Sequence, residues 1–101
     1  RTQGEMLGMT VVPVTPQVAG ELGLPEGASG LAVTHVDQVS EAFAKGLREG
    51  DVITEAGQQP VNGVDDLETR VTEAREAGRK SLLLLIRRGG DPRFVALSIE
   101  E

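Results

Sequence analysis

The residue types that usually carry catalysis or metal binding are few in this chain, and they do not converge. His35 is the only histidine and there is no cysteine, so no metal site or histidine–nucleophile pair can be completed. No serine lies in a Gly-x-Ser-x-Gly context, and the acidic residues fall mostly on predicted helices and turns, where solvated faces and caps explain them. We therefore expect no catalytic residue, no metal and no cofactor, and a chain that is not itself an enzyme.

Composition narrows the class of partner. At 101 residues the chain is the size of one domain, and its few aromatic residues predict a core of Val, Leu, Ile and Ala. A formal net charge of −6 argues against nucleic acid, which is bound mainly through Lys and Arg. No apolar run is long enough for membrane insertion. Residues 1–5 contain neither an initiator Met nor a signal peptide, so we expect a fragment of a longer protein.

One stretch, residues 5–11, has a pattern that indicates binding. A glycine between apolar residues lets successive backbone N–H groups point inward as an anion nest, and an open strand edge can pair with an extended peptide. The strand predicted at 9–14 is expected to lie at a sheet edge because Pro13 has no N–H for a ladder. The same residues also fit an ordinary turn into a first strand, so both interpretations stay open.

The other elements follow from periodicity and end signals. A short helix is expected between the Thr15-Pro16 start and Gly23, and another after Ser40. Asp65 and Glu68 resemble a capping box for a main helix from Asp66 to Ala77. Further strands are expected at 31–36, 52–54, 61, 81–87 and 93–99, the apolar run at 81–87 being the centre of the sheet and buried on both faces.

These elements make one α+β unit of five or six short strands and two or three helices. Residues 42–53, followed by 57–61 and the helix from Asp66, resemble the signature half of a PDZ domain in residue order, spacing and type. The last strand would replace the one that opens an animal PDZ chain. The resemblance therefore implies the circularly permuted, partly open antiparallel barrel or sandwich of bacterial PDZ domains.

Residues 7–16 are also similar to the second PDZ domain of periplasmic HtrA/Deg-type serine proteases. That resemblance implies a periplasmic location, an attached protease domain that this chain lacks, and neighbouring PDZ domains. It implies a carboxylate-binding loop, a strand that pairs with the ligand backbone, and a helix closing the groove. The implied peptide-binding residues are Met6, Leu7, Gly8, Met9, Thr10, Val11 and Val12, with Val71 and Glu68 on the helix.

Two functions remain open. The first is capture of hydrophobic C-termini or extended unfolded segments for the attached protease. The second is a structural module that mediates oligomer assembly or interdomain contacts, which Pro13 favours because it blunts an exposed edge. Glu41 and Phe43 depart from the Pro and Ala frequent in the family. They leave the expected fold unchanged, and the methionines at 6 and 9 make the pocket adaptable.

Overall fold

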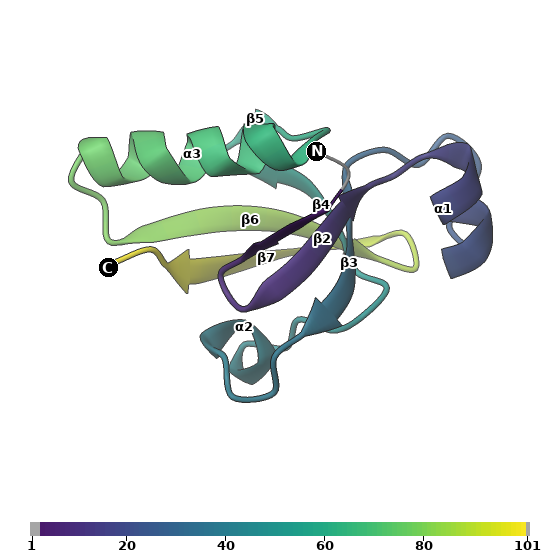
Figure 1. Ribbon diagram of the computed structural model, residues 1–101, viewed down its shortest axis with the longest axis horizontal. Coiled ribbons are helices and arrows are strands. Elements are labelled where there is room, and N and C mark those ends of the chain that lie inside the picture. Colours follow the sequence, from purple (N-terminus) through teal and green to yellow (C-terminus); the bar gives the residue numbers. More distant parts are fainter. Residues whose placement is uncertain (1–2, 101) are drawn as a thin grey trace.

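The computed structural model describes residues 3–100 (Figure 1). Arg1 and Thr2, on which part of the fragment expectation rests, and Glu101 lie outside the described residues. The strands are β1 (Gly4–Met6), β2 (Met9–Pro13), β3 (Leu31–Val36), β4 (Val52–Ala56), β5 (Gln59–Pro60), β6 (Ser81–Arg88) and β7 (Asp91–Ser98). The helices are α1 (Pro16–Leu22), α2 (Glu41–Ala44) and α3 (Val64–Glu76).

All strand pairings are antiparallel and form one seven-stranded sheet. Its order is β1-β2-β3-β4-β6-β7, with β5 paired to β4 alone. The strand count exceeds the expected five or six because β1 was not predicted, whereas β5 (Gln59–Pro60) takes the place of the strand element expected at Val61. The prediction that β2 is an edge strand is wrong, because β1 pairs along one side of β2 and β3 along the other.

The two short helices begin as their capping residues predict. Thr15 accepts a hydrogen bond from the Val18 N–H at 3.1 Å through its hydroxyl, and Gly23 ends α1 with φ 68°. At the start of α2, the Ser40 hydroxyl accepts the Phe43 N–H at 3.1 Å. The sequence signals at both helices are therefore confirmed.

The start of α3 differs from the predicted one. The N-cap is Gly63, and the carboxylate of Asp66 accepts the N–H groups of Asn62 and Gly63 at 2.8 and 3.2 Å. The predicted capping box of Asp65 and Glu68 is therefore wrong, since an acid three residues after a glycine satisfies the free N–H groups equally well. The apolar spacing was informative nonetheless. The inward face of α3 carries Val64, Leu67, Val71 and Ala74.

The core consists of aliphatic side chains, as the composition predicts, and α3 lies along one side of the sheet over it (Figure 1). The expectation that β6 is buried on both faces is wrong. Its burial alternates, with Leu82, Leu84 and Ile86 inward and Leu83 37% exposed on the other face. Phe94 of β7 is 65% exposed. These two side chains are therefore apolar groups that the described residues leave partly exposed.

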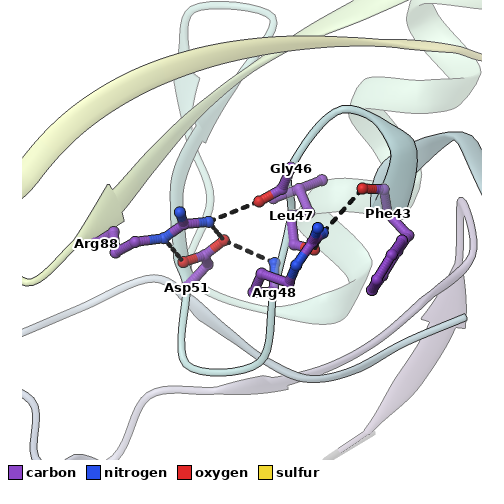
Figure 2. Close-up of polar contacts among 6 residues, drawn as sticks. All are labelled: Phe43, Gly46, Leu47, Arg48, Asp51 and Arg88. Carbon is purple, nitrogen blue, oxygen red and sulfur yellow. Dashed lines mark hydrogen bonds and ion pairs between the residues drawn. The ribbon is translucent and has the colours of Figure 1, made fainter. Parts of the chain in front are cut away.

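The turn between α2 and β4 is held by one buried carboxylate (Figure 2). Asp51 is 1% exposed, and its two oxygens accept hydrogen bonds from Arg88 Nε at 2.7 Å and Nη2 at 2.8 Å. One oxygen also accepts the Arg48 N–H at 3.0 Å, and Arg88 Nη2 donates to the Gly46 carbonyl at 2.7 Å. The hydrogen bond and the charge of Asp51 raise the pKa of Arg88, against the effect of desolvation. This cluster ties the chain before β4 to the end of β6.

Candidate peptide-binding site

Residues 4–13 fold as a tight β-hairpin. Leu7 and Gly8 form its two-residue turn with φ 55° and 80°, and Met6 lies opposite Met9. Positive φ at both turn positions is typical of type I′, whose twist suits paired strands. For Leu7 this backbone conformation costs roughly 1–2 kcal/mol, because its Cβ crowds the following carbonyl. The turn is therefore under strain at one of its two positions.

The turn rests on the residues that precede α2. The Gly8 carbonyl accepts the Asp37 N–H at 2.9 Å, and a Cβ on Gly8 would lie 2.9 Å from the Ser40 hydroxyl. A larger residue than glycine at position 8 would therefore meet both an unfavourable φ and the Ser40 side chain. The side chains of Met6 and Leu7 are half-buried and pack against the core.

The predicted peptide-pairing residues lie together on β2. Met9 and Val11 are buried, whereas Thr10 and Val12 are half-buried. β1 pairs with Met9, Thr10 and Val11 of β2, through the residue pairs Met6–Met9, Glu5–Thr10 and Gly4–Val11. Val12 pairs with Ala32 of β3 and lies beyond the last pair with β1. The edge that was expected to be open is therefore covered by the chain's own segment over most of its length.

The two predicted helix residues of α3 differ in burial. Val71 is 7% exposed and belongs to the inward face, in the same core cluster as Met9 and Val11. Glu68, three residues earlier in the helix, is exposed. Val71 and the hairpin residues Met9 and Val11 thus belong to one core cluster, of which Glu68 is not a member.

Sequence reasoning missed two residues at this site, Gly4 and Val64. Gly4 is buried, and a Cβ there would overlap the Val64 side chain at the start of α3. The only available signal was the alternation of 4–6 on either side of a two-residue turn. Leu-Gly is not among the usual type I′ pairs, because asparagine, aspartate or glycine is preferred at the first position.

A hollow of about 360 Å³ lies beside the turn. Its lining consists of hairpin residues together with His35 and Asp37, and includes no residue of α3. His35 and Thr10 are cross-strand partners, and Glu5 pairs with Thr10 on the other side. His35 is exposed on this hollowed face, so it has the surface position expected of a non-catalytic histidine.

Two further features are absent from residues 3–100. No cluster of three or more His, Cys, Asp or Glu side chains there is arranged to hold a metal ion. Likewise, none of the helices in that range combines the length and apolarity needed to cross a membrane.

Relatives of known sequence align with most of this chain. The chain is 38% identical over 102 aligned positions to a probable periplasmic serine endoprotease DegP-like of Brucella suis, covering 98% of this chain and 18% of that relative. A protein of the same name from Bartonella henselae is 44% identical over 69% of this chain and 14% of its own length. The chain thus spans less than a fifth of the curated relatives it matches.

Solved structures agree in fold. The HtrA3 PDZ domain bound to a phage-derived ligand, FGRWV, superposes with a TM-score of 0.74 at 27% identity, covering 95% of this chain and 85% of that one. The HtrA-type protease AlgW with a decapeptide gives 0.74 at 26% identity, covering 95% and 29%. These matches confirm the predicted PDZ-like fold. The family model for the PDZ domain matches residues 6–99. A PDZ domain is a binding module, which agrees with the expectation that the chain is not itself an enzyme. The chain therefore belongs to the PDZ family.

Proposed function

We propose that this domain binds extended polypeptides by strand addition at β2, preferring hydrophobic C-termini or unfolded segments. The ligand backbone would pair with Thr10, Val11 and Val12, and the turn amides of Leu7, Gly8 and Met9 would receive a terminal carboxylate. Met6 would begin the carboxylate-binding loop, and the side chains of Leu7 and Met9 would line the pocket for the last side chain. Val71 and Glu68 would lie on the side of α3.

One observation carries the proposal: the outer edge of β2 already accepts a strand. β1 runs antiparallel to β2 with its last residue nearest the Leu7–Gly8 turn. A peptide whose C-terminus points at that turn would run in the same direction. The peptides named with HtrA3 and AlgW support the class of ligand, since both proteins superpose over 95% of this chain.

We also place the domain in a larger protein. Its relatives are named periplasmic serine endoproteases, and the chain covers only 18% of the Brucella suis relative. The proposed parent is an HtrA/Deg-type protease of the bacterial periplasm in which residues 1–101 form a single PDZ domain. The catalytic domain would then lie elsewhere in the protein, and bound segments would be delivered to it for quality control.

The test is a binding titration with a library of peptides that end in hydrophobic residues, each made with a free and an amidated C-terminus. We expect saturable binding of the free acids and at least about ten-fold weaker binding of the amides, since a carboxylate held by backbone N–H groups contributes a charge-assisted hydrogen bond. Equal binding of both forms would contradict the carboxylate loop. No binding by any peptide, to this chain or to the β1-weakened variant described below, would contradict peptide capture.

A second function, assembly with neighbouring domains, is favoured by a different surface. Leu83 and Phe94 are exposed large apolar residues on adjacent strands, β6 and β7, with Leu85 opposite Phe94. Exposed apolar patches of this kind often mark contacts between proteins. Deleting this domain from the full-length protein, or introducing Phe94→Ser, should then lower its oligomeric state in analytical ultracentrifugation. An unchanged state in both would contradict the assembly role.

A further inference from the structure

We propose that β1 is a built-in competitor: it occupies the position of the ligand strand, and peptide binding requires its release from β2. This inference rests on the proposed peptide-binding function. It adds that the site is closed in the unliganded domain and that the affinity measured for any ligand includes the opening of β1.

The geometry of β1 matches that of a strand-adding ligand. Its residues pair with Met9, Thr10 and Val11, and two of these, Thr10 and Val11, are also proposed to pair with a peptide. It approaches the turn with its C-terminal end, and its Met6 side chain packs against the core beside Met9. A single edge of β2 cannot pair with two strands at once, because each backbone N–H and C=O on that side has one antiparallel partner.

Two features make β1 displaceable. It is only three residues long, so few pairs hold it, and short hairpins are marginal by themselves. The turn that returns the chain to β2 carries Leu7 at φ 55°, a conformation that a non-glycine residue adopts with strain. Releasing β1 would relieve that strain and free the turn amides. The structure thus combines a weak strand with a turn that favours its opening.

The register of β1 also indicates the form of the ligand. In that register the last residue of a peptide replaces Met6, the penultimate residue points to solvent as Glu5 does, and the third from last replaces Gly4. At the third position from the C-terminus, where Gly4 now lies, a Cβ would overlap Val64. Peptides with glycine third from the C-terminus and a long apolar last residue should therefore bind best, including a tetrapeptide with the sequence of residues 3–6.

A reversible lock gives the sharpest test. Glu5 and Thr10 are directly opposite one pair beyond the turn, where strands of a hairpin lie closest, and the chain has no cysteine of its own. The double variant Glu5→Cys/Thr10→Cys can therefore form one disulfide that fixes β1 on β2. The probe is the tetrapeptide of residues 3–6 with a free C-terminus, beside the tightest peptide of the library. We expect binding in the reduced protein and at least about a hundred-fold weaker binding in the oxidised protein.

The opposite variant should weaken β1. Gly4→Val places a branched side chain against Val64 without changing β2. We expect the peptides to bind about ten-fold more tightly, because a closed state that holds about 90% of the molecules lowers the apparent affinity by that factor and the variant removes it. Adding Val64→Ala makes room for the new side chain and should return the affinity toward that of the unmodified chain. Near-native unfolding midpoints for both variants would confirm that they fold.

The outcomes separate the two proposals. Equal affinity in the oxidised and reduced forms, with binding present in both, would overturn the competition by β1 and leave peptide binding intact. Absence of binding in the oxidised, reduced and Gly4→Val forms alike would overturn the proposed function itself. Loss of binding on oxidation together with tighter binding by Gly4→Val would support both.

Discussion

The Asp51–Arg88 cluster and the β1–β2 hairpin solve the same problem, fixing a turn of the chain, in opposite ways. Asp51 is buried and accepts three hydrogen bonds from side-chain and backbone donors, which join residues 37 positions apart. The hairpin is held by three residue pairs and a turn with strained Leu7. The turn that contains Asp51 is thus fixed by a buried ion pair, whereas the proposed binding edge is held by interactions that can open.

The largest expected effect is at Asp51. Asp51→Ala removes the acceptor of both Arg88 bonds and of the Arg48 N–H, and should lower the free energy of unfolding by about 3 kcal/mol. Chemical denaturation measures this change. Glu49→Ala is the matched control, because it removes an exposed acid from the same turn and should change stability by less than about 0.5 kcal/mol. Similar losses in both variants would show that the buried ion pair does not fix this turn.

The next effect is at Gly8, in the hairpin turn. Gly8→Ala should cost about 2 kcal/mol, part from φ 80° and part from the overlap with Ser40. Ser40→Gly removes the obstructing side chain while a glycine N-cap costs only a few tenths of a kcal/mol. In a double-mutant cycle the pair should therefore recover about 1 kcal/mol. Strict additivity would mean that the Ser40 side chain does not constrain the turn.

A smaller effect is expected when the geometry of the ion pair, but not its charge, is changed. Arg88→Lys keeps the cation yet cannot donate two parallel bonds to Asp51 and reach the Gly46 carbonyl as well. The Arg88 side chain is 40% exposed, so we expect a loss of about 1 kcal/mol in the free energy of unfolding. A loss as large as that of Asp51→Ala would indicate that the turn depends on the second N–H donor of the guanidinium and not on its positive charge.

The smallest effect on stability should come from β1. Gly4→Val should lower the free energy of unfolding by less than about 1 kcal/mol, because local opening of a short edge strand does not require global unfolding. Hydrogen exchange should nevertheless accelerate at Gly4–Met6 and on the facing side of β2, and stay slow in β6. If exchange in β6 rose equally, β1 would belong to the cooperative core, and the contrast between the two regions would fail.

Much of this architecture could be predicted from the sequence. Thr15, Ser40 and Gly23 mark helix ends because a hydroxyl or a left-handed glycine satisfies free backbone groups locally. Apolar periodicity also predicted a main helix and two final strands where α3, β6 and β7 lie. These features depend on neighbours in the sequence, so pattern and residue type were sufficient.

The candidate site shows where such reasoning ends. The residues of the Leu7–Gly8 turn and of β2 were correctly grouped in one segment, yet β1 was not expected, and it covers the edge predicted to be open. Three residues carry too little alternation to show a strand, and Leu-Gly is an unusual type I′ pair. The choice of Gly63 over Asp65 as N-cap was likewise decided by how the chain enters α3.

The sequence by itself therefore determined the elements, the aliphatic core and the family, because these depend on periodicity, capping and a specific order of residues. Only the tertiary structure decided what lies on the outer edge of β2. Which strand pairs there depends on the contact of Gly4 with Val64 and of Gly8 with Ser40, between residues 60 and 32 positions apart. Contacts of such separation leave no periodic trace in either segment, since each side requires only a small residue at one position.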